Sequence, residues 1–317
     1  MLPSTLIRPS SVLFVFLDGV GLGEADRAIN PLAAHPLPAF EHLAGGAPWT
    51  AETPLVSAAD HVVRPIDATL GVEGLPQSGT GQATLFSGVN CAALAGRHYG
   101  PYPHSTSKPI LREQSIFARL LGAGHETEHL AFANAYPERF FVHAWERKRW
   151  TVTTYACRKA GIRLRTTEEL RQGDALAAGI TNALWRTHLD PSMPEVHEEE
   201  GARRLARFAE HHPFTLFEYY LTDKAGHAQD AAQAESILRT LDRFFGALLD
   251  LLDFKRTLLV VSSDHGNLED LSIKTHTRHP VPLIAHGVGA SALAEATSLT
   301  DVTPALVPLL GPTKTGA

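Results

Sequence analysis

Val12-Leu-Phe-Val-Phe-Leu17 is a continuous apolar run of β-forming residues, and Asp18-Gly19 follows it at once. An unbroken apolar run of this length, bounded by turn residues, is typical of a strand that is buried on both faces of a parallel sheet. Two later segments, residues 214–221 and 257–262, have the same character. Together the three segments predict the centre of an α/β fold.

The segment between the second and third of these strands has the period of an amphipathic helix. Its apolar residues recur at helical spacing: Ile237, Leu238, Leu241, Phe244, Phe245, Leu248, Leu249 and Leu252. A strand–helix–strand order implies a right-handed crossover and parallel strands. Residues 281–285 predict a shorter strand, which Pro282 places near an edge of the sheet. Residues 301–310 predict a last helix, so we expect a layered α/β core with a mostly parallel sheet.

Residues 95–210 differ from the segments on either side, because they contain helical patterns and one short candidate strand, residues 130–133. Residues 96–165 carry twelve Lys or Arg against five Asp or Glu, in a chain whose net charge is −6. This positive surplus fits either a solvated face or a basic lid over an anionic substrate. We expect an inserted, mainly helical cap at 95–210, on a core formed by residues 1–94 and 211–317.

Composition excludes several classes of protein. The 317 residues are 44% hydrophobic and 20% charged, as in an ordinary globular protein. No apolar run approaches the ~20 residues of a membrane-spanning helix, and we expect neither a signal peptide nor a membrane partner. The net charge of −6 excludes a generally basic nucleic-acid binder. Cys91 and Cys157 are too few for a disulfide framework and fit a reducing, cytoplasmic location.

Aspartate and histidine side chains follow the ends of the predicted strands, at the edge where ligands collect in parallel sheets. The six side chains are Asp18, Asp223, His227, Asp264, His265 and His276. Asp223 and His227 are one helical turn apart and can face the same point, whereas His279 lies near His276 and is a rival for its role. Three carboxylates and three imidazoles suit two divalent metals with positions left open for a substrate. The donor set fits Mn²⁺ or Zn²⁺.

A hydroxyl-rich stretch, Ser78-Gly-Thr-Gly-Gln-Ala-Thr84, leads into an apolar helical segment. A hydroxyl at a helix N-terminus lies in positive potential and has backbone N–H groups at hand for an anion. Next to a metal, such a hydroxyl can act as a nucleophile. The candidates are Ser78, Thr80 and Thr84, and a glycine-rich turn without a catalytic role is the alternative.

These motifs resemble those of the alkaline phosphatase superfamily, and most closely its branch of cofactor-independent phosphoglycerate mutases and phosphopentomutases. The matching segments are Leu17-Asp-Gly-Val-Gly21, Asp223-Lys-Ala-Gly-His227, Asp264-His-Gly-Asn267 and His276-Thr-Arg-His-Pro-Val-Pro282. The resemblance covers residues 10–92 and 212–312, and it implies a three-layer α/β core with a mostly parallel sheet. It also implies phosphoryl transfer on a small phosphorylated metabolite through a phosphoserine, by a phosphomutase or a phosphomonoesterase.

The resemblance further implies roles for individual residues. Ser78 matches the nucleophile, because it stands three residues before Gly81 and ten before Gly88. The implied ligands are Asp18, Ser78, Asp264 and His265 for one metal, and Asp223, His227 and His276 for the other. The mutase-like motifs favour Mn²⁺, with Zn²⁺ as the alternative. Gln82 stands where the mutases have a histidine, and therefore the reaction type is better supported than the substrate.

The sequence does not predict which phosphorylated substrate is used, nor the oligomeric state. Transfer to water gives a phosphatase, and return of the phosphoryl group to the substrate gives a mutase. A nucleotide pyrophosphatase or phosphodiesterase and a non-catalytic metal-binding relative are the alternatives. A phosphorylated metabolite needs charge recognition at its non-reacting end, for which arginine is suited. We therefore expect at least one of Arg97, Arg139 and Arg147 to point from the cap into the metal cleft.

Overall fold

The structure is a computed structural model that describes residues 8–311. Within these residues the core is one seven-stranded sheet in the order β2-β3-β7-β6-β1-β5-β4. The strands are β1 (Ser11–Leu17), β2 (Val56–Ser57), β3 (His61–Ile66), β4 (Leu130–Phe132), β5 (Phe214–Tyr219), β6 (Thr257–Ser262) and β7 (Val281–His286). Strands β6, β1, β5 and β4 are parallel, whereas β7 is antiparallel to its neighbours β6 and β3. The predicted α/β fold with a mostly parallel sheet is confirmed.

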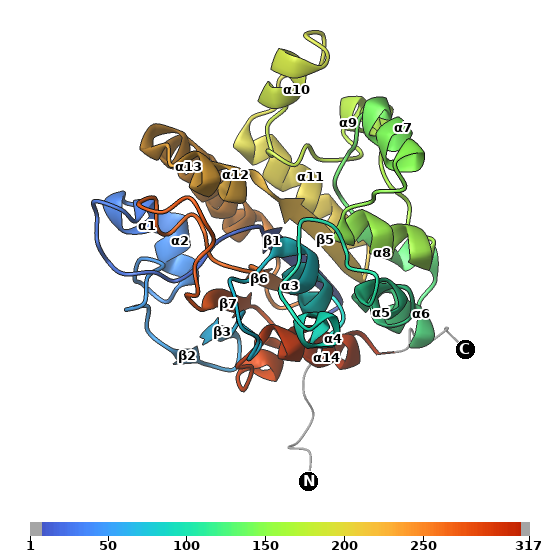
Figure 1. The fold of residues 1–317 in the computed structure, drawn as a ribbon. Helices are drawn as coiled ribbons and strands as arrows, with labels where there is room; N and C mark the ends of the chain where they lie inside the picture. The colour runs from blue at the N-terminus through green and yellow to red at the C-terminus, as the bar shows by residue number, and fades with distance from the viewer. Residues whose placement is uncertain (1–7, 312–317) are drawn as a thin grey trace.

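Helices cover both faces of the sheet (Figure 1). One layer contains α3 (Ser78–Leu85), α4 (Cys91–Ala95), α5 (Ser107–Gln114), α6 (Ile116–Gly122), α8 (Val152–Ala160) and α14 (Leu299–Leu310). The other contains α1 (Pro31–Ala34), α2 (Pro38–Leu43), α11 (Glu198–His211), α12 (Leu221–Ala228) and α13 (Ala231–Leu251). Successive side chains of β1 enter alternate layers, Phe14 one and Val15 the other, which explains why the whole strand is apolar.

The remaining helices are α7 (Glu138–Glu146), α9 (Thr167–Gln172), α10 (Ala183–His188) and the short 3₁₀ turns η1 (Thr127–His129) and η2 (Ala290–Leu293). Helices α7, α9 and α10 lie beyond the layers, at the top of Figure 1. A small, separate cluster of buried side chains in this region includes Leu170, Trp185 and Met193. Among residues 8–311, no helix is both long enough and apolar enough to cross a bilayer.

Residues 95–210 are tied to the core more closely than the sequence indicates. Strand β4 extends the sheet beside β5, and α5, α6 and α8 bury apolar side chains in one of its layers. The candidate strand at residues 130–133 is therefore β4, although so short a segment does not show from its sequence which strand it pairs with. The division into a core of residues 1–94 and 211–317 and a cap of residues 95–210 stays a prediction, and α7, α9 and α10 are the part of that cap that stands outside the layers.

Strand β7 corrects the expectation that Pro282 places it near an edge, because it lies between β3 and β6. Proline is disfavoured inside a sheet because it lacks the N–H that a ladder requires. Here Pro282 lies opposite Pro65 of β3, and the pairing of β7 with β6 begins only at Leu283. The missing N–H therefore falls outside the β6 ladder, and an inner strand tolerates the proline.

The parallel strands β1, β5 and β6 end at the same edge of the sheet, and the loop that enters the antiparallel β7 opens there too. We call this edge, with the loops that leave it, the metal edge. Gly19 turns the chain after β1 with a φ of +69°, and a Cβ there would lie 2.8 Å from the side chain of Asp223. The backbone N–H of Gly19 also bonds to Asp264, 245 positions later in the chain. The topology thus gathers distant segments into one small volume.

Candidate metal centre

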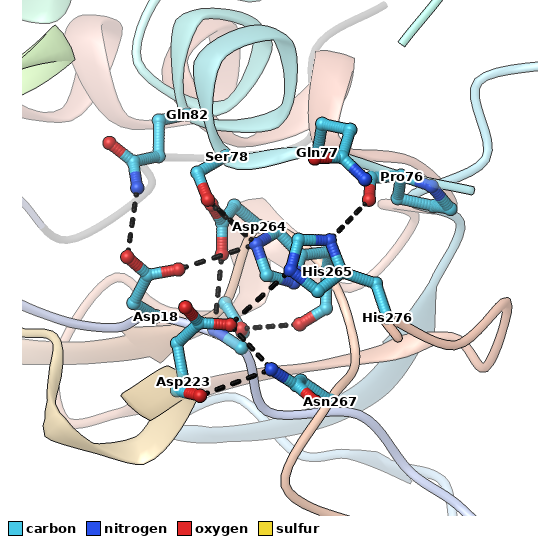
Figure 2. A network of polar contacts seen from close by, with 12 residues as sticks. Asp18, Pro76, Gln77, Ser78, Gln82, Asp223, Asp264, His265, Asn267 and His276 are labelled. Carbon is cyan, nitrogen blue, oxygen red and sulfur yellow. Dashed lines mark hydrogen bonds and ion pairs between the residues drawn. The ribbon is translucent and has the colours of Figure 1, made fainter. Parts of the chain in front are cut away.

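Asp18, Asp264 and His265 form the first of two clusters at the metal edge (Figure 2). Their ligand atoms lie within 4.8 Å of one another, and all three side chains are buried. His265 Nε2 lies 3.4 Å from Asp18 Oδ1 and 3.5 Å from Asp264 Oδ2. Neither of these carboxylate oxygens has a hydrogen-bond partner among the described residues. Buried oxygens without partners beside an imidazole nitrogen are a donor set that a divalent cation would satisfy.

Asp223, His227 and His276 form the second cluster, whose ligand atoms also lie within 4.8 Å of one another. Asp223 Oδ2 is 3.5 Å from His227 Nε2, and its Oδ1 is 3.5 Å from His276 Nε2. The two imidazole nitrogens are 3.1 Å apart. Asp223 and His227 lie on α12, and His276 comes from the loop before β7. Because the side chain of His227 is 43% exposed, this cluster is open to solvent on one side.

The three imidazoles are oriented in the same way. In His227, His276 and His265, Nδ1 lies 3.0, 2.7 and 3.3 Å from a backbone carbonyl oxygen, respectively. A carbonyl can only accept, so Nδ1 carries the proton of the neutral ring, and Nε2 is the nitrogen whose lone pair takes up either a second proton or a metal. Each Nε2 faces a carboxylate of its cluster. Metal-binding histidines are typically fixed by such a bond from the second ring nitrogen, and the clusters therefore fit metals on this ground as well.

The electrostatics of the clusters also favour a cation. Burial raises the pKa of Asp18, and the nearby carboxylate of Asp264 raises it further. Burial would lower the pKa of His265, but Asp264 and Asp18 raise it to about 10. Burial would likewise raise the pKa of Asp223, yet its contacts with His276 and His265 lower it to about 2. A protonated imidazole balances part of this negative charge, and divalent cations would balance it more fully.

Ser78 is the first residue of α3 and points toward the first cluster (Figure 2). Its Oγ lies 3.0 Å from His265 Nε2. Gly81, one turn further along α3, lets the helix approach the loop after β6, because a Cβ there would come within 2.7 Å of the Asp264 carbonyl oxygen. Gln82 Nε2 donates to Asp18 Oδ2 at 3.2 Å. The start of α3 is thus held directly against the metal edge.

The other two hydroxyl candidates are engaged elsewhere. Thr80 Oγ1 donates to the carbonyl of Gln77 at 3.3 Å and accepts from the N–H of Tyr99 at 3.1 Å. Thr84 Oγ1 donates to the carbonyl of Thr80 at 2.8 Å. Both side chains are fully buried inside α3 and its packing. Among the three, Ser78 is the hydroxyl that lies beside a predicted metal ligand.

Two further buried side chains, which had no predicted role, hold the clusters and their loops in place through hydrogen bonds. Asn267 Nδ2 donates to Asp223 Oδ1 at 2.7 Å. Glu269 accepts from the backbone N–H groups of Gly21 and Asn267, at 2.8 Å each. It also accepts from Thr277 Oγ1, and from His279 Nδ1 at 3.1 Å. Glu269 therefore joins the loop after β1 to both halves of the β6–β7 loop, and His279 contacts this carboxylate rather than either cluster.

A cleft of about 650 Å³ opens over both clusters, with Asp18, Ser78 and Asp223 among its lining residues. Of the three arginines expected to reach it, Arg139 lines the cleft. Arg97 instead lies over the ring of Tyr99, 5.6 Å from its centroid. Arg147 follows the C-terminus of α7 and is exposed. Arg139 lies in the first turn of α7, near the cleft, whereas Arg147 lies at the opposite end of the helix. The sequence alone does not show which part of α7 faces the metal edge.

Known proteins match part of this chain in sequence. Residues 189–314 match the family model of the Metalloenzyme superfamily. A 2,3-bisphosphoglycerate-independent phosphoglycerate mutase of Methanocorpusculum labreanum is 33% identical over 115 residues, which are 36% of this chain and 27% of that protein. The enzyme of the same name from Pseudomonas fluorescens is 29% identical over 128 residues, 38% of this chain and 25% of that protein. The matched stretch thus spans about a quarter of these relatives.

Solved structures resemble nearly the whole chain. The alkaline phosphatase of the Antarctic bacterium TAB5 has a TM-score of 0.59 at 13% identity, over 96% of this chain and 99% of that one. A protein from Pyrococcus horikoshii has a TM-score of 0.57 at 15% identity, over 99% of this chain and 100% of that one. At these identities the likeness concerns the fold, and it confirms the expected alkaline-phosphatase-like core.

Proposed function

We propose that this chain, a metalloenzyme of the alkaline phosphatase superfamily, transfers the phosphoryl group of a small phosphorylated metabolite through a phosphoserine at Ser78. One observation carries the proposal: Ser78 Oγ lies 3.0 Å from His265 Nε2, at the N-terminus of α3. A hydroxyl in this place has predicted metal ligands on one side and the cleft on the other. That is the placement a nucleophile needs.

We assign two divalent metals to the clusters. Their ligands are Asp18, Ser78, Asp264 and His265 for one metal, and Asp223, His227 and His276 for the other. Bound there, the cations would activate the serine hydroxyl and neutralise charge on the phosphoryl oxygens. The mixed oxygen and nitrogen donors fit Mn²⁺ or Zn²⁺, and the mutase-like motifs favour Mn²⁺.

The residues of the chain place the reacting groups. Ser78 Oγ gives up its proton and attacks phosphorus in line, and the bond from phosphorus to the alcohol oxygen breaks on the opposite side, so that this oxygen takes up a proton and leaves as the alcohol. The reaction takes place at the positive end of the α3 dipole, which favours the anionic phosphoryl group. Gln82 holds Asp18 through its hydrogen bond to Oδ2. The phosphoserine then passes its phosphoryl group to an acceptor hydroxyl, and Ser78 regains its proton.

The acceptor decides between a phosphatase and a mutase, and the exposure of the site favours water. Tyr220, which lines the cleft, is 39% exposed, and the side chain of His227 is 43% exposed. A mutase must exclude water while its intermediate reorients. We therefore favour a phosphomonoesterase and keep the mutase as the second candidate, on the strength of the mutase relatives.

We also propose that the enzyme works in the cytoplasm on a diffusible substrate, without a nucleic-acid partner. Cys91 and Cys157 are both buried free thiols, which fits a reducing compartment. The cleft residues combine metal ligands with a few cationic side chains, and this suits a small anion rather than a polymer backbone.

A phosphate-release assay tests the proposal. The Mn²⁺- or Zn²⁺-loaded protein is incubated with sugar phosphates, phosphoglycerates and nucleotides, and phosphate and isomer formation are measured in parallel. We expect phosphate release from at least one phosphomonoester, and its loss in Ser78→Ala. Isomer formation without phosphate release identifies the mutase. Neither product from any substrate, with both metals shown to be bound, identifies a non-catalytic metal-binding protein and overturns the proposal.

A further inference from the structure

We infer that the cleft selects phosphomonoesters whose alcohol carries a planar ring, such as an aryl, heteroaryl or nucleoside-type group. This inference rests on the proposed function, since it names the substrate class of the same site. It is carried by the cap-side wall of the cleft, which we define as Tyr136, Pro137, Arg139 and Phe140.

The cap-side wall presents a stacked aromatic pair. The ring centroids of Tyr136 and Phe140 are 4.2 Å apart, with 30° between the ring planes. Phe140 is also held edge-on by Trp150, 6.0 Å away at 84°. Both rings of the pair are half-buried and line the cleft, so part of their surface is free for a ligand. A fixed pair of this kind binds a planar ring by stacking, and it loses little conformational freedom when it does so.

Other residues extend this apolar surface around the ligand. Pro137 is the N-cap residue of α7, and Pro101 and Tyr220 contribute further ring-bearing side chains to the lining. A cleft of about 650 Å³ lies within the size range of sites for ligands with one or two rings. A three-carbon phosphate ester would leave most of this apolar surface in contact with water.

The charges in the cleft argue against a compact polyanion. Arg139 and Lys224 line it, and so does Glu218, whose carboxyl group accepts a hydrogen bond from Thr153 Oγ1 at 2.6 Å. A substrate with a second anionic group on a short chain would bring that group close to Glu218 and to the apolar rings. An alcohol with a planar ring and hydroxyl or amino donors instead matches both the aromatic pair and the acidic side chain.

Benzyl phosphate and ethyl phosphate make a matched pair of substrates, because both release an unactivated primary alcohol and differ only in that benzyl carries a phenyl group where ethyl carries a methyl group. We expect the Mn²⁺-loaded enzyme to show at least tenfold higher kcat/KM for benzyl phosphate. Phe140→Ala should reduce this preference to less than threefold, mainly through KM. Val142→Ala is the control, since Val142 lies on the same helix, is 46% exposed and does not line the cleft.

Binding of benzylphosphonate and ethylphosphonate by calorimetry gives a readout that does not depend on turnover. We expect the same tenfold preference for the ring, and the same loss in Phe140→Ala. Phe140→Leu, which keeps apolar volume but lacks a flat face, covers the case in which the alanine variant fails to fold.

Equal binding and equal kcat/KM for the two members of each pair would overturn the inference, while hydrolysis of both esters would leave the proposed function standing. A ring preference in binding, without turnover of any ester, would overturn the proposed function and leave the inference standing. A preference that survives in both Phe140 variants would show that the cap-side wall is not what selects the ring.

Discussion

The metal edge and the cap-side wall face the same cleft but are built differently. At the metal edge, Asp18 follows directly on β1, Asp264 comes two residues after the end of β6, and both are buried. The cap-side wall comes from α7 and the turn before it, where Arg139 is exposed and Phe140 half-buried. The sheet therefore fixes the chemistry, whereas a surface helix shapes the part of the cleft that meets the rest of the substrate. The second region can change without disturbing the first.

The largest effect should come from the metal edge. Ser78→Ala removes the attacking oxygen and should lower kcat by more than about 10³-fold, because the hydroxyls of Thr80 and Thr84 are bonded to backbone carbonyls away from the clusters. Metal binding, measured by calorimetry, should persist at the second cluster. Thr80→Ala is the control, since its hydroxyl bonds to the backbone of its own helix and a neighbouring loop. If Thr80→Ala abolishes activity and Ser78→Ala does not, the nucleophile has been assigned to the wrong residue.

The second effect concerns Glu218, which lies where the two regions meet. It is the second-last residue of β5 and accepts a hydrogen bond from Thr153 Oγ1 of α8 at 2.6 Å. Burial raises its pKa from 4.5 to about 7, although the Thr153 hydroxyl opposes the rise. A raised carboxyl pKa means that the stabilisation is complete below the unfolded pKa and is lost as pH rises through the folded pKa.

Glu218→Gln stays neutral, and so its unfolding free energy should decline less between pH 5 and pH 8 than that of the parent, by up to about 3 kcal/mol. Urea unfolding of the chelator-treated protein at both pH values measures this difference. Glu210→Gln, at an exposed position, is the control, and its unfolding free energy should change with pH as that of the parent does. Parallel pH profiles for parent and Glu218→Gln would mean that the carboxyl group titrates normally.

The third prediction concerns Glu269, which positions the loops of the metal edge but is not itself a predicted metal ligand. Glu269→Gln keeps the shape of the side chain but removes its charge and one acceptor oxygen, and should weaken Mn²⁺ binding about 10- to 100-fold because the loop after β1 and the β6–β7 loop are then held less firmly together. Mn²⁺ titration by calorimetry measures it. Asp270→Asn, whose side chain bonds to Ser272, is the neighbouring control. Unchanged affinity in Glu269→Gln would show that the loops hold their places without this carboxylate.

The smallest effect should come from the cap-side wall. Arg139→Ala should lower kcat/KM by about tenfold, ~1.4 kcal/mol, because one cation that faces the cleft is lost. Metal affinity should not change. Arg147→Ala, on an exposed position at the other end of α7, is the matched control. If both variants have the same kcat/KM as the parent, the basic residues of segment 96–165 only form a solvated face.

The sequence predicted the metal edge better than the cap-side wall, and the reason is physical. Asp264 and Asp223 each follow a strand whose apolar run is visible in the sequence, and the strands bring them to one edge of the sheet. Arg139 could be named only as one of three arginines, because its direction depends on how α7 packs. The role of Glu269 was not predicted, because a buried carboxylate that accepts from backbone N–H groups leaves no periodic pattern in the sequence. Pro282 led to the wrong prediction of an edge position for β7, because the sequence does not show at which residue the pairing with β6 begins.

The central place of β1 has a consequence for the synthesis of the chain. Its neighbours are β5 and β6, and Val12 pairs with Phe214, which is made about 200 residues later. At about 5–20 residues per second, a ribosome takes roughly 10–40 s to cover that distance. For that time the nascent chain carries an apolar strand with both edges unpaired, which is an aggregation hazard and a natural target for chaperones. Among the described strands, β1 thus waits longest for its first partner.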